Sequence, residues 1–318
     1  MNSECSCDSG YSYSDTNDSF NINDRIGLLM NLLFVSIIIL SLFIVFTWNR
    51  LSSNMMIYIL IILCVLFIGN IIMNPIHVLY MPSMVLSTFI RTPPILKRNS
   101  YFPNHKLLED PSTFTKIQQE VTNMLDKTNK GNSLTLTKDS YGGNNVSIGS
   151  DIKINDDGVK AWRLLNIMVG ESYTQDALDH FPTLVDTLRK LPEVKSCVVS
   201  VLEPGIHIPI HVGYYKGLMR YMLPTHIPKE KDKVFLCVNG IKYHWTEGEG
   251  VLWDDTYAHK VYNNSNEIRV LIYMDVKRPL QNESVSFMNE WNDWFLNKVT
   301  GSYIIKKEIE RTEKQIKI

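Results

Sequence analysis

The chain has 318 residues, a formal net charge of −1 and five scattered cysteines. That length holds one sizeable domain with accessory segments, or two small domains. The near-neutral charge argues against a nucleic-acid-binding protein, which normally carries a basic patch. Because no Cys-x-x-Cys pair occurs, neither a disulfide scaffold nor a structural zinc site is indicated.

Residues 1–24 are polar, contain five acidic residues and lack Lys and Arg. This composition predicts a disordered segment, because it offers little apolar surface to bury. It also lacks the basic start of a cleavable signal peptide.

Two long apolar runs follow, at residues 26–48 and 55–80, and neither contains Asp, Glu, Lys or Arg. A helix needs about 20 apolar residues to cross a bilayer core. We therefore predict a transmembrane helical hairpin over residues 25–80, with one lumen-directed anchor plus a re-entrant segment as the alternative. The short loop contains only Arg50, whereas more positive residues flank the pair (Arg25, Arg91, Lys97, Arg98). The positive-inside tendency then predicts a two-pass integral membrane protein with both ends in the cytoplasm.

Residues 81–99 form the predicted juxtamembrane linker, where three prolines prevent a long helix. A globular domain is expected over residues 100–282. A helix is predicted to begin at Pro111, with apolar residues at helical spacing, and a second covers residues 177–191. The Gly-, Asn- and Ser-rich stretch 127–150 is typical of a loop.

From residue 196 the pattern changes to short strands separated by turn signals. The pair Asn239-Gly240 is the favoured two-residue hairpin turn. The predicted fold is an all-β core, a cupin-like jelly roll or double-stranded β-helix with flanking helices. Residues 283–318 are expected to form a C-terminal helix and a charged tail. The expected strands are 197–202, 217–223, 233–238, 241–245, 250–253 and 268–276.

Two histidines, His211 and His259, are the candidate metal ligands in this core. They are too far apart in sequence for one helix or hairpin, and Arg269 follows ten residues after the second. Non-haem iron sites commonly use two histidines and a carboxylate. The carboxylate usually lies two residues after the first histidine, and that position is Gly213 here. Taken alone, the triad is incomplete, and ordinary structural roles for both histidines remain open.

Three segments in order resemble the motifs of the aspartyl/asparaginyl β-hydroxylase family. Residues 200–213 contain Ser-x-Leu-x-Pro-Gly and end in His-x-Gly. Residues 254–262 read Asp-Asp-Thr-Tyr-Ala-His-Lys-Val-Tyr, and residues 269–279 contain Arg, Asp-Val and Pro at the spacing of the family. The resemblance covers roughly residues 100–282 and excludes the apolar runs. It implies a double-stranded β-helix that uses Fe(II), 2-oxoglutarate and O2.

The resemblance also implies roles for individual residues. The family uses two histidines and no carboxylate, so His211 and His259 would hold the iron. Arg269 would pair with a carboxylate of 2-oxoglutarate, for which the planar guanidinium fork is suited. Ser200 and Arg220 would make further contacts to this cosubstrate, although plain strand positions are the alternative for both.

Other positions carry weaker expectations. Trp162 matches a position on the substrate side of the family, and a core tryptophan is the competing interpretation. Met222 stands where the family commonly has a histidine, and its thioether cannot donate a hydrogen bond. Asp254 and Asp255 are expected to form a turn that positions His259.

The expected function is a membrane-anchored dioxygenase that hydroxylates an unactivated carbon, foremost the β-carbon of Asp or Asn in a protein. Its substrate partner would be a protein or a lipid at the membrane, and no nucleic acid is expected. Hydroxylation of a lipid acyl chain is one alternative. A catalytically inactive, membrane-bound binding or scaffold module is the other.

Overall fold

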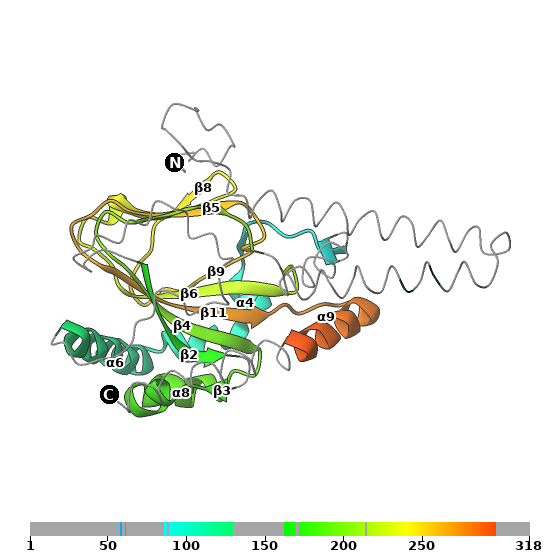
Figure 1. Cartoon of the computed structure of the whole chain (residues 1–318), viewed down its shortest axis with the longest axis horizontal. Helices are drawn as coiled ribbons and strands as arrows, with labels where there is room; N and C mark the ends of the chain where they lie inside the picture. The colour runs from blue at the N-terminus through cyan, green and yellow to red at the C-terminus, as the bar shows by residue number, and fades with distance from the viewer. Residues whose placement is uncertain are drawn as a thin grey trace. The chain divides into compact units, whose positions relative to one another are not determined.

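The fold is that of a computed structural model (Figure 1). It describes Tyr58, Ile61, Leu86, Ser87 and residues 89–129, 162–169, 172–213 and 215–296. The predicted disordered start, nearly all of the predicted transmembrane hairpin, most of the 127–150 loop and the charged tail lie outside the described residues. Among the described helices, none is both long and apolar enough to cross a bilayer. The chain divides into two compact units, and the fold below belongs to the unit that includes residues 86–318.

Two antiparallel sheets form the centre of this unit. The larger sheet has seven strands in the order β1-β9-β6-β11-β4-β2-β3, and the smaller has four in the order β5-β10-β7-β8. The strands of the larger sheet are β1 (Ile95–Leu96), β2 (Trp162–Val169), β3 (Ser172–Tyr173), β4 (Val194–Leu202), β6 (Leu218–His226), β9 (Val251–Trp253) and β11 (Arg269–Lys277). Those of the smaller sheet are β5 (His207–His211), β7 (Val234–Val238), β8 (Ile241–Tyr243) and β10 (His259–Asn263).

The helices lie outside this pair of sheets, and several cover the outer face of the larger one (Figure 1). Apolar side chains from α5, α6, α7 and α8 pack in one core with that face. The described helical elements are α4 (Arg98–Tyr101), η2 (Pro103–His105), α5 (Lys106–Glu109), α6 (Pro111–Asn129), α7 (Gln175–His180), α8 (Pro182–Leu188), η3 (Lys231–Lys233) and α9 (Glu283–Leu296). The predicted all-β core with flanking helices is therefore confirmed.

Alternation along β11 decides which residues face the interior between the sheets. Ile272 and Met274 pack in the outer core beneath the helices, whereas Leu271 and Tyr273 pack in the inner core with strands of both sheets. Successive side chains of a strand point to opposite faces. Arg269 shares its face with Leu271 and Tyr273, so its strand position directs it into the interior.

Three local predictions need correction. The helix expected over residues 177–191 is two helices, α7 and α8, because Pro182 lacks an amide hydrogen and begins a new helix. Strand β6 continues through Pro224 to His226, and the register shift against β11 there accommodates the proline. Helix α6 extends to Asn129, into the predicted loop.

The predicted hairpin turn is confirmed. Asn239 and Gly240 both have positive φ, 46° and 80°, between β7 and β8. Asparagine and glycine tolerate this left-handed region, and such a turn matches the twist of the strands it joins. The hairpin closes the smaller sheet next to β10, which carries His259.

Candidate functional site

The two candidate metal ligands lie on neighbouring strands of the smaller sheet. His259 opens β10 and is the cross-strand partner of His211, which ends β5. Directly opposed residues of an antiparallel pair have Cβ atoms about 5 Å apart. A register irregularity follows directly after His259. The fold thus brings together two histidines that the sequence separates by 48 positions.

His259 is held in a form that suits metal binding. Its ring is buried, with 5% of its surface exposed. The Nδ1–H donates to the carbonyl oxygen of Tyr257 over 2.8 Å. Because a carbonyl only accepts, this bond fixes the tautomer that carries the lone pair on Nε2, as is usual for metal-ligating histidines. The ring of Trp253 meets the His259 ring edge-on, at a centroid distance of 4.6 Å.

Gly213 lies against Asp255, at the position where the usual iron site has its carboxylate. A Cβ placed on Gly213 would lie 2.4 Å from the carboxyl carbon of Asp255. The Gly213 amide donates to the Asp255 backbone oxygen over 2.7 Å. A side chain at position 213 would therefore require the Asp255 carboxyl to move. The carboxyl of Asp255 fills the space beside it.

The Asp255 carboxyl belongs to a small charged group with Arg220. The Arg220 guanidinium pairs with Asp255 at 3.0 Å and with Asp275 at 3.0 Å, and it lies over the ring of Tyr273. Burial raises the pKa of Asp255 to about 6; Arg220 opposes this shift, and the like charge of Asp275 reinforces it. Arg220 therefore has two carboxylate partners within the protein. Its contact to 2-oxoglutarate stays a prediction.

Arg269 is a buried cation with unused hydrogen-bonding capacity. Its side chain lies at the start of β11 with 2% of the residue exposed. Within the described part of the chain, its Nε and Nη2 have no hydrogen-bond partner. The guanidinium lies 5.4 Å from the ring centroid of Trp245, and burial lowers the pKa of Arg269 to about 9. A buried, unsatisfied charge costs several kcal/mol, so this position fits an anionic ligand.

Ser200 and Trp162 are in contact with each other. The Trp162 Nε1–H donates to the Ser200 hydroxyl over 2.9 Å. Ser200 is buried on β4, directly between Leu164 of β2 and Leu271 of β11. Its cross-strand partner Leu271 lies in the inner core, so Ser200 shares the face of Arg269.

Met222 lies in the same interior. It is buried in the inner core and is the cross-strand partner of Val251 and Tyr273. Its surroundings explain why an apolar side chain is accepted at this position.

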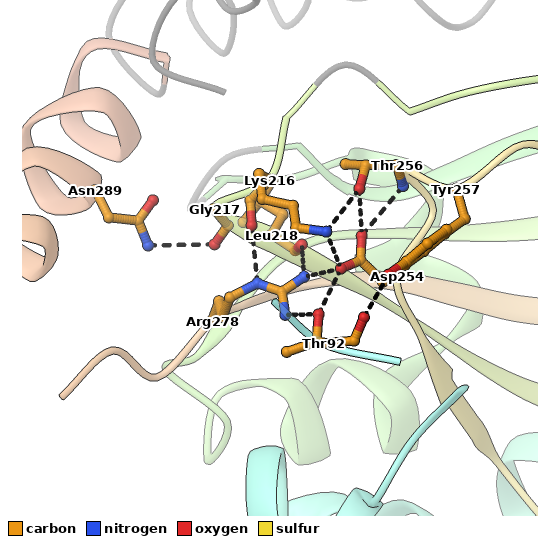
Figure 2. A network of polar contacts seen from close by, with 9 residues as sticks. All are labelled: Thr92, Lys216, Gly217, Leu218, Asp254, Thr256, Tyr257, Arg278 and Asn289. Carbon is orange, nitrogen blue, oxygen red and sulfur yellow. Dashed lines mark hydrogen bonds and ion pairs between the residues drawn. The ribbon is translucent and has the colours of Figure 1, made fainter. Parts of the chain in front are cut away.

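The expected turn at Asp254 and Asp255 is confirmed, and Asp254 also centres a buried ion network (Figure 2). Its Oδ1 accepts from the amide and the hydroxyl of Thr256, which forms the turn before His259. Its Oδ2 pairs with Lys216 at 2.7 Å and with Arg278 at 2.8 Å. Burial alone would raise the pKa of Asp254, but Arg278, Lys216 and Thr256 together hold it below the usual value.

The remaining contacts show what this network connects. Arg278 also donates to the backbone oxygens of Lys216 and Leu218, and the hydroxyl of Thr92 donates to Asp254. The Tyr257 hydroxyl donates to the Thr92 carbonyl (Figure 2). The linker before β1, the loop before β6, the end of β9 and the end of β11 are thereby tied to the turn that carries His259.

Several of these residues were not singled out from the sequence. Trp245, Lys216 and Arg278 contribute through the fold. Asp275 is the Asp of the Asp-Val motif, and period-two alternation from Arg269 places both on one face of β11. No comparable signal links Lys216 to Asp254, which it meets across 38 positions.

Among the described side chains, no three from His, Cys, Asp and Glu are gathered as a metal site. The side chain of His211 lies outside the described part. The fit to a metal therefore depends on the register of the two histidines, the tautomer of His259 and the neighbouring Asp255 carboxyl.

Known proteins share part of this chain. An acyl 2-hydroxylase of the ester-linked chain of ornithine lipid, from Rhizobium tropici, is 33% identical over 100 residues, which cover 31% of this chain and 36% of that protein. The human aspartyl/asparaginyl β-hydroxylase is 31% identical over 110 residues, 33% of this chain and 14% of that protein. The chain therefore spans only a minor part of the length of either relative.

Among solved structures, a prolyl-4-hydroxylase from Pseudomonas putida overlaps 52% of this chain and 88% of its own, with a TM-score of 0.32 and 11% identity. That score is too low to contribute to the assignment. The sequence profile of aspartyl/asparaginyl β-hydroxylases matches residues 112–279, which is more than half of the chain and includes every candidate site residue. The geometry and this match agree, and the chain belongs to the aspartyl/asparaginyl β-hydroxylase family.

Proposed function

We propose that this chain is a membrane-anchored, Fe(II)- and 2-oxoglutarate-dependent dioxygenase that hydroxylates an unactivated carbon. The observation that carries the proposal is the buried guanidinium of Arg269, whose Nε and Nη2 lack partners among the described residues. A buried cation without a partner destabilises the fold, and a bound anion would offset that cost. A dicarboxylic cosubstrate supplies that anion.

The histidine pair would hold the metal. His211 and His259 would bind iron from neighbouring strands, and the bond from the His259 Nδ1–H to Tyr257 leaves the lone pair on Nε2 for a metal. When bound, the iron would supply the redox chemistry that couples oxidation of 2-oxoglutarate by O2 to hydroxylation. Asp255 offers a carboxyl beside position 213 that can accept a hydrogen bond from a ligand in the site.

The interior face of the larger sheet would orient the cosubstrate. Arg269 would receive its far carboxylate in a bidentate pair. The Ser200 hydroxyl already accepts from Trp162, so its own hydrogen is available to donate to an anion. Arg220 would make a further contact to the cosubstrate, while its ion pairs with Asp255 and Asp275 restrict the position of its guanidinium. The apolar residues of the inner core exclude water from this space.

The proposed substrate is the β-carbon of Asp or Asn in a protein, as in the human relative whose name states that activity. One observation favours a second candidate, an acyl chain of a lipid. The relative from Rhizobium tropici is named for such a reaction and is 33% identical, and this chain has two apolar runs of bilayer length. The proposed location is a membrane, with both ends of the chain in the cytoplasm.

The test uses the full chain, purified in detergent without oxygen. After loading with Fe(II), we expect O2-dependent conversion of 2-oxoglutarate to succinate, increased by a substrate peptide containing Asp and Asn or by a lipid extract. Mass spectrometry of both then identifies the hydroxylated product. Absence of turnover by the folded, iron-loaded chain with both substrate classes would contradict the enzyme proposal.

Iron content separates the enzyme from an inactive scaffold. We expect His211→Ala and His259→Ala to lose bound Fe(II). The matched control is His207→Ala, on the same strand, because the His207 ring is exposed and contacts Asn264. Iron content that is unchanged in His211→Ala would favour the scaffold alternative.

A further inference from the structure

Helix α9 presents an aromatic face to solvent. Phe287, Trp291 and Trp294 are 71%, 56% and 56% exposed. Their spacing of four and three residues places them on one side of the helix. Three large aromatic side chains gathered in this way form an apolar patch of the kind that marks a binding surface.

The opposite side of α9 is fixed to the domain. Asn289 is buried and donates through Nδ2 to the Gly217 carbonyl over 3.2 Å (Figure 2). Its Oδ1 accepts from the Tyr215 hydroxyl. A Cβ on Gly217 would lie 2.0 Å from this Oδ1, so the helix approaches the loop closely. Because the inner side is anchored by these bonds, the direction of the aromatic face is set by the domain.

The same helix packs against the segment that follows the second apolar run. Leu86 and Ile90 form a small buried cluster with Tyr215 and with Val285 of α9. Between them, Phe89 is 66% exposed. The second apolar run ends at residue 80, six residues before Leu86, and six extended residues reach about 20 Å at most. A bilayer that held this run would therefore begin within that reach of Leu86.

We propose that the aromatic face of α9, formed by Phe287, Trp291 and Trp294, lies in the headgroup region of the bilayer that holds the apolar runs. Tryptophan suits this region because its ring is apolar and its N–H is polar. Helix α9 carries three acidic residues, Glu283, Glu290 and Asp293, and, within its own bounds, no Lys or Arg. Because α9 offers no basic residue to an anionic lipid, the partner surface is a neutral phospholipid headgroup layer. The apolar runs, which anchor the chain, would hold α9 close to that layer. This inference rests on the membrane anchoring proposed above and is independent of the iron chemistry.

The test measures tryptophan fluorescence of the full chain in two kinds of phosphatidylcholine vesicle, one with plain and one with brominated acyl chains. The brominated chains quench nearby indoles, so the difference between the two vesicles reports indoles that contact lipid. The chain has six tryptophans, including Trp48 in the first apolar run. The double variant Trp291→Phe/Trp294→Phe keeps the surface apolar and removes both reporters. We expect it to lose most of the lipid-quenchable fluorescence of the parent chain. The control Trp162→Phe, which removes an interior indole, should not lower that component.

The outcomes separate this inference from the proposed anchoring. Flotation of the chain with vesicles is measured first, and failure to float would overturn both. If the chain floats but the double variant and the parent show the same lipid-quenchable fluorescence, the face of α9 does not touch lipid and only this inference is wrong. A change of oligomeric mass in the double variant, with that component unchanged, would assign the face to a second copy of the chain.

Discussion

At the scale of single residues, Arg269 offers the sharpest distinction between a structural and a ligand-binding role. Its guanidinium is buried and partly unsatisfied within the described part of the chain. Replacing a buried charge with an apolar side chain of similar volume is often neutral or stabilising, by up to about 4 kcal/mol. We therefore expect Arg269→Met to keep or raise the free energy of unfolding of the ligand-free chain.

The same variant should lose its affinity for 2-oxoglutarate by about a hundredfold or more, since a buried charge pair is worth roughly 3–5 kcal/mol. Denaturant unfolding and equilibrium binding measure the two effects separately. Arg189→Met is the control for loss of an arginine, because Arg189 is exposed and contacts Asp186 and the ring of Tyr173 at the surface. Strong destabilisation of the Arg269 variant would show that this arginine serves the fold.

Asp255 gives a pH dependence with a defined sign. Its pKa is raised from 3.8 to about 6 by burial, with Arg220 opposing the shift and Asp275 reinforcing it. Between about pH 4 and pH 6 the folded chain keeps a proton that the unfolded chain has lost, so stability falls as the pH rises. Above pH 6 the cost is constant, at about 3 kcal/mol at most.

Asp255→Asn removes this cost. We expect the metal-free variant to unfold with a higher midpoint than the parent at pH 7.5, and the difference to vanish near pH 4. Thermal unfolding followed by circular dichroism at both pH values measures it. The exposed Asp186→Asn should show little difference at either pH. A variant of Asp255 that is less stable at pH 7.5 would mean that its pairing with Arg220 outweighs burial.

At the scale of elements, the Asp254 network holds four segments around the turn before His259. Removing the carboxylate leaves the charges of Lys216 and Arg278 buried without their counter-ion. Loss of one partner of a buried ion pair lowers stability by about 3–5 kcal/mol. We expect Asp254→Asn to lower the free energy of unfolding by that order. Because the pKa of Asp254 is held low, this stabilisation is present above its unfolded value and is lost only as the pH falls through the lowered folded value.

Urea unfolding at neutral pH, with Asp110→Asn as an exposed control, checks this expectation. A double variant, Asp254→Asn with Arg278→Met, should recover part of the loss because it removes one uncompensated charge. Absence of any recovery would mean that the packing of Arg278, and not its charge, stabilises this corner of the fold.

The strands differed in how well the sequence predicted them. Strands β4, β6 and β11 contain long β-branched and apolar stretches, so they were predicted within a few residues. Strands β5 and β10 have five residues each, with His207 and His259 at their starts, which is too short for a clear pattern. Pro209 in the middle of β5 also argues against a strand there. The register that joins the two histidines is a long-range property, which local patterns do not contain.

At the scale of the whole molecule, family motifs located the site better than composition did. The sequence identified His259 and Arg269 by motif, and the fold added their surroundings, such as Trp245 beside Arg269 and the Asp255 carboxyl beside Gly213. These contacts join segments far apart in the chain. Strand β4 is buried on both faces, so alternation alone could not assign Ser200 to the interior.

The arrangement of the whole chain across a membrane gives the last prediction. With both ends in the cytoplasm, residues 86–318 of the chain in intact microsomes face the outside, and added protease should digest them without detergent. The triplet Asn282-Glu283-Ser284 is an N-glycosylation sequon, and Asn282 is exposed. Its Oδ1 accepts from the Val285 amide, and its Nδ2 is the atom to which a glycan would be attached. With the domain in the cytoplasm, we expect this sequon to carry no glycan. A lumenal resident protein, digested only after detergent, is the control. Protection of the domain together with a glycan on Asn282 would place it in the lumen, and the positive-inside argument from Arg25, Arg91 and Lys97 would then be wrong for this chain.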